Sequence, residues 1–521
     1  MARRAKPTFK PYHRQQRKLF VESDAVIPDN HIVRVVDAAV DALNVEPLLA
    51  KYQLDGRASY HPVMMLKLLI YAYTQKIYSC RKIAKLAREN LMAIWLCDSN
   101  KPDFKTINTF RSEKMKHVML EVFAEVVDLL ERRGYIKLET YFLDGTKIAA
   151  DANPYSWVWG KSTKWYKEAL RKKCASLFLE IDREEEREEV LYEGKDLPEM
   201  GERVEIDSEA IREMAVRIDT LLAESPKDRK LKKASRLIRK DYLPRMEKYE
   251  HQEEVLEERN SYSKSDTDAT FMRMKEDHMR NGQLKPAYNV QIGTENQFIV
   301  GYSVHRRPGD TGCMIDHLDT AKRQRKGRLP STLVADAGYG SEENYSHLAK
   351  WNISACVKYN LYHKEQSRTW REDPTRVQNW SYDASTNTYT CGVGRTLVHI
   401  GNRKSRSKNG FESLVSVYEC TDCTGCPHKE SCTEREGNRQ LHVNHRNNAF
   451  RADARKLLDS PLGETLRKRR SIEVESVFGN IKSNYGVTRF SLRGLDKVNL
   501  EWGLHSIAHN MRKMASYAVG I

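Results

Sequence analysis

The sequence predicts an α/β fold, in which a mixed sheet is covered by helices. Residues 285–304 are expected to form two strands joined by a tight turn, because apolar and β-branched runs flank Thr294-Glu295-Asn296. A helix over 316–323 follows, then a short apolar strand over 333–335, a second helix over 341–350 and a strand over 353–359. This alternation of strands and helices is typical of a sheet with helices packed on it.

The chain has 521 residues, which is more than one compact core holds, so we expect several domains. Residues 1–135 carry apolar side chains at helical spacing and predict an all-helical N-terminal domain. Two segments of different composition are expected to be insertions, a charged helical one at 158–262 and a β-rich one with clustered cysteines at 361–445. The core then consists of the remaining segments, 136–157, 263–360 and 446–521.

The charged insertion at 158–262 contains runs such as Asp182 to Glu189, which flank apolar residues at helical spacing. This pattern indicates helices that pack as an antiparallel, coiled-coil-like arm. A structural spacer or a dimerisation arm is the interpretation that we favour for this segment.

The charge balance favours a polyanionic partner. The chain has 88 Lys and Arg against 72 Asp and Glu, a formal net charge of +16, and nucleic acid is the most common partner of such a protein. The same charge also suits a protein that only needs a soluble surface. No apolar run reaches 18 residues, and the basic N-terminus lacks the apolar core of a signal peptide, so we expect no membrane span. Ten cysteines, scattered except for one cluster, suit a reducing cytoplasm.

A helix that starts near Lys105 is the candidate DNA-reading element of the N-terminal domain. Ile107 and Phe110 would face inward on this helix, while its outer face would carry Lys105, Asn108, Arg111 and Ser112. One interpretation is a helix-turn-helix whose last helix enters a major groove. The other is a plain helical bundle with a solvated basic face.

Four cysteines in the second insertion form the pattern C-x2-C-x2-C-x5-C, at Cys420, Cys423, Cys426 and Cys432. Four thiolates at this spacing can surround a tetrahedral zinc ion, which would fold a segment that has little apolar core. Four protein ligands leave no open position, so we predict a structural zinc. An iron–sulfur cluster uses related spacing, and reduced thiols without metal are the remaining alternative.

Carboxylates at two strand ends and on a late helix are candidate metal ligands. Asp144 and Asp336 each follow an apolar strand and precede or lie near a glycine, at the place where α/β sheets bind ligands. A cap of the following turn would explain either residue equally well. On the basic-led helix over 467–482, Glu473 and Glu475 both flank the apolar stripe, and helical phase does not choose between them.

Three acids from separate elements suit two-metal phosphodiester chemistry, in which two ions lie about 3.5–4 Å apart. Carboxylate oxygens favour Mg²⁺ or Mn²⁺, and neighbouring Lys and Arg would hold the phosphate backbone. The candidate backbone contacts around the late helix are Arg469, Arg470, Lys482, Arg489 and Arg493.

Short motifs along nearly the whole chain resemble those of the DDE transposases of bacterial insertion sequences. In the N-terminal region these motifs are at 27–31, 61–62, 79–83 and 102–111. In the core they are Asp144-Gly145-Thr146-Lys147-Ile148, Asp266-Thr267-Asp268-Ala269, Tyr288-Asn289-Val290-Gln291 and Asp336-Ala337-Gly338-Tyr339-Gly340. Near the end they are Glu475-x2-Phe478-Gly479-x2-Lys482 and Arg493-Gly494. Each motif is short, and their joint order is specific to the family.

The resemblance implies an RNase H-like core with an acidic triad of Asp144, Asp336 and Glu475. The lysine that follows the family's glutamate selects Glu475 over Glu473, and Lys482 would contact phosphate near the cut. The family often has an arginine four residues before the glutamate, but Ser471 stands there, so the role falls to Arg469 or Arg470. Gly338 and Gly340 are expected to keep the loop beside Asp336 open for a DNA strand.

The implied chemistry is Mg²⁺-dependent hydrolysis at the ends of the element, followed by attack of the freed 3′-hydroxyl on target DNA. The implied partners are double-stranded DNA and a second copy of the chain that brings two ends together. Two alternatives remain. One is an RNase H-like nuclease or an inactive, DNA-binding relative. The other is a zinc-containing DNA-binding regulator, which would have no use for acids at strand ends.

Overall fold

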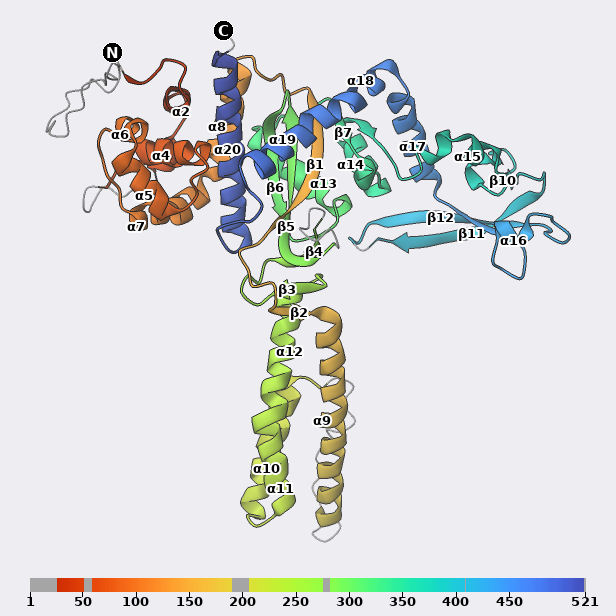
Figure 1. The fold of residues 1–521 in the computed structure, drawn as a ribbon. Coiled ribbons are helices and arrows are strands. Elements are labelled where there is room, and N and C mark those ends of the chain that lie inside the picture. The colour runs from red at the N-terminus through yellow and green to blue at the C-terminus, as the bar shows by residue number, and fades with distance from the viewer. Residues whose placement is uncertain (1–25, 51–58, 190–205, 275–281, 408, 520–521) are drawn as a thin grey trace, which may run out of the picture. The chain divides into compact units, whose positions relative to one another are not determined.

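The computed structural model describes residues 26–519 except 51–58, 190–205, 275–281 and 408 (Figure 1). The chain divides into two compact units, one of residues 1–130 and 504–521 and the other of residues 131–503. The sequence predicts that residues 446–521 all belong to the core, whereas the described residues from Leu504 onward group with the first unit. Among the described residues, no helix is both long and apolar enough to cross a membrane.

The first unit is helical, as the sequence predicts. Local signals explain where its helices start: Pro62 stands in the first turn of α4, and the Asp103 carboxylate accepts hydrogen bonds from the first N–H groups of α7. Its helices are α2 (Ile32–Asp41), α3 (Glu46–Leu49), α4 (Pro62–Thr74), α5 (Cys80–Glu89), α6 (Leu91–Leu96), α7 (Phe104–Thr109), the π turn η1 (Phe110–Lys114), the 3₁₀ turn η2 (Met115–His117), α8 (Met119–Arg132) and the part of α20 (Leu495–Val519) that begins at Leu504.

Arg111 does not lie on the outer face of the candidate DNA-reading helix. It is 4% exposed and donates hydrogen bonds to Tyr78 O at 2.8 Å and to Tyr73 Oη at 3.3 Å. Arg111 stands four residues after the buried Ile107, and residues four apart share one face of a helix, so the helical phase itself turns Arg111 inward and its assignment to the outer face is wrong. Lys105 and Asn108 are exposed, as predicted.

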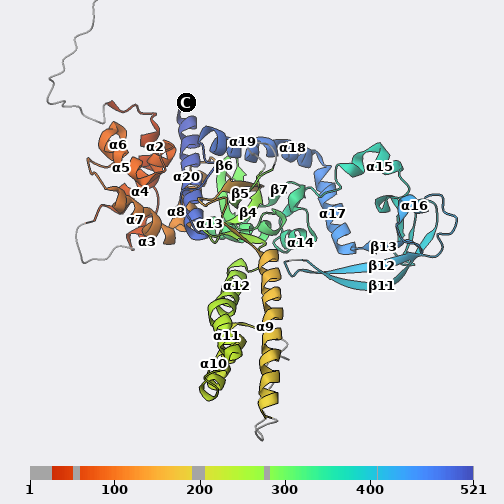
Figure 2. The same cartoon turned by 60° about the horizontal axis from the view of Figure 1, so that its bottom comes forward.

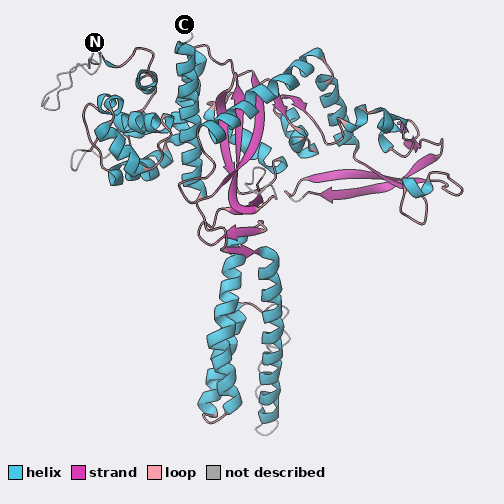
Figure 3. Ribbon diagram, viewed as in Figure 1, coloured by secondary structure: helices cyan, strands magenta, loops and turns pink. Residues whose placement is uncertain are grey.

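The second unit is built on a mixed sheet with the strand order β6–β5–β1–β7–β8, and β4 also pairs with β5. The first three strands are antiparallel, whereas β7 and β8 run parallel to β1 (Figure 3). The strands are β1 (Thr140–Ala149), β4 (Thr270–Arg273), β5 (Leu284–Glu295), β6 (Phe298–His305), β7 (Thr332–Ala335) and β8 (Ser354–Val357). α13 (Met314–Gln324) packs on β6, while β8 contacts α14 (Glu342–Lys350) and α17 (His445–Leu458).

Tyr141 connects the centre of the sheet to α13 through its packing and its hydrogen bond. Its ring lies against Gly293 and Gly301 of the neighbouring strands, where any side chain would overlap it. Its hydroxyl is 2.8 Å from Nε2 of His317 on α13, whose Nδ1 is 2.7 Å from Ser303 Oγ. Burial lowers the pKa of His317 to about 3, so the ring is neutral and can donate from one nitrogen and accept at the other.

The charged segment forms a helical bundle with its own core. β2 (Trp157–Trp159) pairs with β3 (Ser261–Ser263), and the segment between them contains α9 (Gly160–Glu189), α10 (Ser208–Glu224), α11 (Arg229–Leu237), the π turn η3 (Ile238–Tyr242) and α12 (Leu243–Leu256) (Figure 2). Its buried side chains include Leu170, Phe178, Ile211, Ile218, Ile238 and Met246. Several helices of this segment therefore share one core.

The β-rich segment forms a separate five-stranded sheet in the order β13–β12–β11–β10–β9. Its strands are β9 (Ser381–Asp383), β10 (Thr388–Thr390), β11 (Thr396–Arg406), β12 (Glu412–Cys420) and β13 (Gln440–Val443). A small core of Trp380, Tyr389, Leu397 and Tyr418 includes two of the clustered cysteines, Cys420 and Cys423.

The packing around Tyr141 predicts that Gly293→Ala destabilises the second unit. A Cβ at Gly293 would lie 1.7 Å from Tyr141 Cζ, and overpacking on this scale is expected to lower the free energy of unfolding by at least about 3 kcal/mol. Gly479→Ala is the control, because a Cβ there meets no atom within 4 Å and an alanine favours the helix by about 0.5–1 kcal/mol. Thermal unfolding of both variants checks this, and equal melting temperatures would contradict the packing.

Candidate active site

Asp144 and Asp336 lie side by side on neighbouring parallel strands. β1 and β7 pair with Phe142 opposite Val334, and the same offset along both strands sets Asp144 beside Asp336. Asp336 is the first residue after β7, at the carboxyl end of that strand. The register of two strands therefore brings these two acids together.

Asp144 lies within a strand and not at its end. The apolar pattern predicts a strand that runs into Asp144, but β1 continues to Ala149 because β5 pairs along this whole stretch. The Asp144 side chain is 17% exposed, and its Oδ1 accepts a hydrogen bond from Gly145 N at 2.8 Å. A central strand thus fixes the position of this carboxylate.

Asp336 caps a turn and also faces the other acids. Its Oδ1 accepts a hydrogen bond from Gly338 N at 2.8 Å at the start of the 3₁₀ turn η5 (Ala337–Tyr339), while its Oδ2 faces Arg470. We expected the glycines to keep this loop open, but a Cβ at Gly340 would lie 2.3 Å from Lys358 O. Gly340 therefore allows the turn to pack against the backbone that follows β8.

The third acid comes from a long helix that contains π turns. α18 (Pro461–Arg470) continues through the π turn η8 (Ser471–Glu475) into α19 (Ser476–Gly479) and the π turn η9 (Asn480–Asn484). A π turn holds more residues than an α turn because its hydrogen bonds join residues five apart. Arg470 and Glu475, which are five residues apart, therefore face each other, with Arg470 Nη1 3.3 Å from Glu475 Oε1.

Arg470 forms ion pairs with all three predicted acids. In addition to its contact with Glu475, its Nη2 lies 3.0 Å from Asp144 Oδ2 and 3.7 Å from Asp336 Oδ2. The Arg470 side chain is only 15% exposed. Carboxylates gathered this closely repel one another, and a shared cation offsets the repulsion. The structure therefore brings the predicted triad together around one guanidinium.

Arg469 and Glu473, the alternative arginine and glutamate, form a separate pair. Arg469 Nη2 donates to Glu473 Oε1 at 2.8 Å, and the Arg469 guanidinium lies 5.2 Å from the ring centre of Phe142. Glu473 is 4% exposed, and its Oε2 accepts a hydrogen bond from Gln297 N at 2.7 Å, in the turn between β5 and β6. This pair fastens the helix to the sheet, whereas Glu475 is 58% exposed beside the other acids.

A fourth carboxylate, Asp310, lies near the acids, and the sequence analysis missed it. Asp310 Oδ1 accepts hydrogen bonds from Asn289 Nδ2 at 2.8 Å and from Gln291 Nε2 at 3.0 Å. Gln291 Oε1 in turn accepts one from the buried Tyr339 hydroxyl, whose pKa is raised by burial and further by nearby carboxylates. Asp310 stands in a turn before α13, where no periodic pattern pointed to it.

Two lysines also lie near the site. Lys482, on η9, lines a pocket of about 100 Å³. Gly145, the residue after Asp144, lines the same pocket. The other residues that line this pocket are Thr146, Lys147, Met274, Asn289, Asp310 and Thr488. Lys358, which the sequence analysis did not single out, follows β8, and burial, then the charges of Arg470 and Arg467, lower its pKa. The surroundings of the acids are therefore basic.

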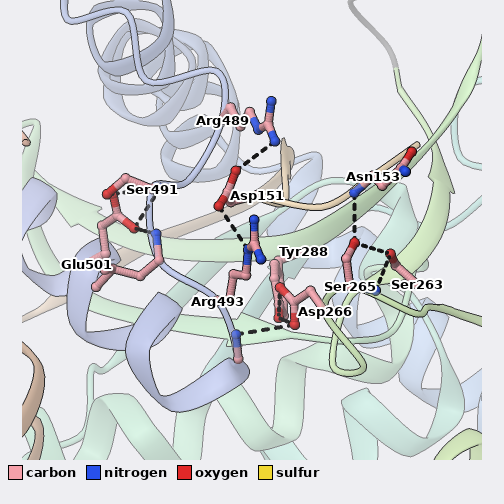
Figure 4. A network of polar contacts seen from close by, with 12 residues as sticks. Asp151, Asn153, Ser263, Ser265, Asp266, Tyr288, Arg489, Ser491, Arg493 and Glu501 are labelled. Carbon is pink, nitrogen blue, oxygen red and sulfur yellow. Dashed lines mark hydrogen bonds and ion pairs between the residues drawn. The ribbon is translucent and has the colours of Figure 1, made fainter. Parts of the chain in front are cut away.

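Arg489 and Arg493, the last two predicted DNA contacts, meet at Asp151. Arg489 Nη2 donates to Asp151 Oδ1 at 2.7 Å, and Arg493 Nε donates to Asp151 Oδ2 at 2.9 Å (Figure 4). Both arginines remain more than half exposed, at 54% and 57%. Asp151 follows β1, and nothing in its sequence context singled it out.

The four predicted zinc ligands line one pocket in the β-rich segment, together with Cys391 and His428. Burial, followed by a hydrogen bond to Cys423, raises the pKa of the Cys420 thiol to about 11. In the part of the chain that the structure describes, no three Asp, Glu, His or Cys side chains are arranged so that they could hold a metal ion. Zinc binding therefore stays a prediction, and so does metal binding by the acids.

Two family models match the chain. A transposase DDE domain matches residues 390–515, which include Glu475, Lys482 and the clustered cysteines. A transposase domain (DUF772) matches residues 21–113, in the helical unit. Both matches are to transposase domains, and together they support a DDE transposase of the insertion-sequence type. No curated protein matches the transposase at a significant level. Its substrate is accordingly DNA.

The matched segments leave out two of the acids. Asp144 and Asp336 precede residue 390, and the transposase joins them to the matched helix through the register of β1 and β7 and through Arg470. The assignment of Asp144, Asp336 and Glu475 as the acidic triad stays a prediction, and the contacts of Arg470 show that the three side chains lie close together.

The different surroundings of the two glutamates predict different effects on stability. Glu473→Gln should lower the free energy of unfolding by about 1–3 kcal/mol, because a buried, hydrogen-bonded charge pair is disrupted. Glu475→Gln, an equal change two residues away, should alter it by less than about 0.5 kcal/mol, since that carboxylate is largely exposed. Denaturant unfolding measures both, and the reverse ranking would show that the helix is docked differently.

Proposed function

We propose that this transposase cleaves the ends of an insertion sequence and joins the freed 3′-hydroxyls to target DNA, with Asp144, Asp336 and Glu475 as its metal-binding acids. The observation that carries the proposal is the convergence of these carboxylates, from two strands and one helix, on Arg470. The strand order around them supports an RNase H-like core.

Mg²⁺ is the ion that we propose for these acids. Carboxylate oxygens are the ligands that this ion prefers, and the ion pairs of Arg470 with all three acids support a site for positive charge at this place. When bound, the metal would activate the attacking oxygen and stabilise the charge that develops on the leaving oxygen. The protein contributes rigid placement, because β1 and the turn after β7 hold two of the acids.

Basic side chains would align the scissile phosphate. Arg470 is held among the acids, so its guanidinium is available next to any phosphate that binds there. Lys482, across the neighbouring pocket, would contact the strand beside the cut. These groups orient the phosphate and offset its charge, which is the main protein contribution to phosphoryl transfer.

DNA outside the site would be held by exposed residues of both units. We propose Lys105 and Asn108 of α7 for the first unit, and Arg489 and Arg493 for the second. Arg111 is left out because it is buried, and Arg469 because it pairs with Glu473. Two DNA ends have to meet before they are joined, and a homodimer is the assembly that we propose for this step.

Substitution of the acids should abolish cleavage without abolishing DNA binding. For Asp144→Asn, Asp336→Asn and Glu475→Gln we expect about a thousandfold loss of Mg²⁺-dependent strand cleavage, since each removes a charged metal ligand. Asp219→Asn is the control, because it removes an exposed carboxylate that pairs with Arg239 in the helical bundle. The substrate is duplex DNA from the borders of the element, with cleavage read on a sequencing gel.

The proposal fails if the wild-type protein binds this DNA but cuts no strand with Mg²⁺ or Mn²⁺. A zinc-containing regulator would give that result. The substitutions of the three acids would then leave DNA binding unchanged. Cleavage that survives in Asp336→Asn at the wild-type rate would show that the acids have been assigned wrongly.

We also propose a structural zinc ion bound by Cys420, Cys423, Cys426 and Cys432. The thiols line one pocket of a sheet whose apolar core is small, and metal binding would stabilise such a segment. Cys426→Ser should remove the zinc that copurifies with the protein, whereas Cys391→Ser, in the same pocket but outside the predicted set, should retain it. Atomic emission on purified protein measures this, and a wild-type protein without zinc would refute the site.

A further inference from the structure

Asp151, Arg489 and Arg493, which we call the arginine pair site, form a second charged cluster just beyond the end of β1, the strand that carries Asp144. Figure 4 shows both guanidinium groups directed at the two oxygens of Asp151. Asp151 is seven residues beyond Asp144, and the strand from Asp144 to Ala149 spans roughly 16 Å at about 3.3 Å per residue. The two residues after the strand bring the separation along the chain to roughly 20 Å.

The loop that carries Arg493 is held by buried carboxylates on both sides. Glu501, which is 1% exposed, accepts hydrogen bonds from Ser491 N and Leu492 N at 3.0 and 2.9 Å. Asp266 accepts one from Gly494 N at 3.2 Å. These N–H groups lie on both sides of Arg493 in the chain. The backbone of Arg493 is therefore held in place, while its side chain remains exposed.

Arg489 is fixed to the end of β1 by backbone pairing. Ala149 N donates to Thr488 O at 3.1 Å, and Phe490 N donates to Ala149 O at 2.9 Å. The segment around Arg489 therefore lies beside the end of β1 and runs parallel to it. β1 is also the strand that contains Asp144. Both arginines consequently have a fixed distance to the predicted active site.

The charges of this cluster do not balance. Two guanidinium groups share one carboxylate, and both arginines are more than half exposed. One arginine would be enough to brace Asp151, so the second leaves a positive charge on a rigid surface. Guanidinium groups match phosphate oxygens in geometry and in charge. Between this cluster and the acids lies the pocket lined by Lys147, Lys482 and Thr488.

We infer that Arg489 and Arg493 bind the sugar–phosphate backbone of the end DNA, roughly 20 Å from the scissile phosphate, and that Asp151 positions them for this contact. In a B-form duplex 20 Å corresponds to about six base pairs. This inference rests on the proposed function, because it takes the acids as the place of the cut. The pocket with Lys147 and Lys482 would be crossed by the DNA between the two points.

A scan with neutral phosphates tests the contact directly. The probe is a fluorescent duplex from the border of the element, in which one phosphate at a time is replaced by a methylphosphonate. For wild-type protein we expect affinity to fall several-fold at one or two positions about six base pairs from the cut. In the double variant Arg489→Gln, Arg493→Gln, replacing the phosphates at these positions should no longer lower the affinity. The slope of log K against log salt should become smaller in magnitude by about 2.

Arg212→Gln is the matched control, because Arg212 is also 54% exposed and pairs with one carboxylate, Glu247, in the helical bundle. It should leave both the scan and the salt slope as in wild type. Asp151→Asn keeps both positive charges but removes the carboxylate that aligns them. Overall DNA binding should therefore persist, while a methylphosphonate about six base pairs from the cut should no longer lower the affinity.

The outcomes separate this inference from the proposed function. If wild-type protein cuts its ends but the double variant keeps the wild-type scan and slope, the arginines only brace the fold and the inference is wrong. If Asp151→Asn lowers the melting temperature and leaves the scan unchanged, Asp151 has no positioning role. If wild-type protein neither binds nor cuts the border DNA, the proposed function fails, and the inference fails with it.

Discussion

The ion pairs of Arg470 with Asp144, Asp336 and Glu475 are the interaction on which the candidate site depends. Two like charges 4 Å apart repel by about 4 kcal/mol at an effective dielectric constant of 20, so three carboxylates do not gather unaided. A guanidinium can meet several of them at once because its donors lie in one plane and point outward. The strand register and the helix position matter for the site because they bring the carboxylates within reach of this one side chain.

A departure from regular helix geometry makes this arrangement possible. In an α-helix, residues four apart share a face, and Ser471 would then oppose Glu475. The π turn η8 takes up one more residue and brings Arg470 to that face. A second π turn contains Lys482. Turns of this kind are found often at functional sites. Here the first of them sets which arginine faces the acids.

The sequence predicted those parts of the molecule that follow a regular period. Strand patterns located Asp144 and Asp336, and helical spacing located most helices and the buried Ile107 and Phe110. It failed where the period changes or the chain is irregular. A π turn brings Arg470 to the acids, which a 3.6-residue phase cannot foresee. Arg111 is a different case, because helical phase already places it four residues after the buried Ile107. Asp151 and Asp310 stand outside periodic segments and acquire partners far along the chain.

The pairing of β2 with β3 has a consequence for how such a chain can change over time. Trp157 lies opposite Ser263, so the points where the helical segment leaves and rejoins the sheet unit are adjacent. The segment also has its own apolar core. A module with neighbouring ends and an independent core can be lengthened, exchanged or lost while the rest of the chain keeps its contacts, since only a short connection is needed to close the gap. The helical bundle can therefore be exchanged as a unit. Its sequence can also change faster than that of Arg470 and the three acids.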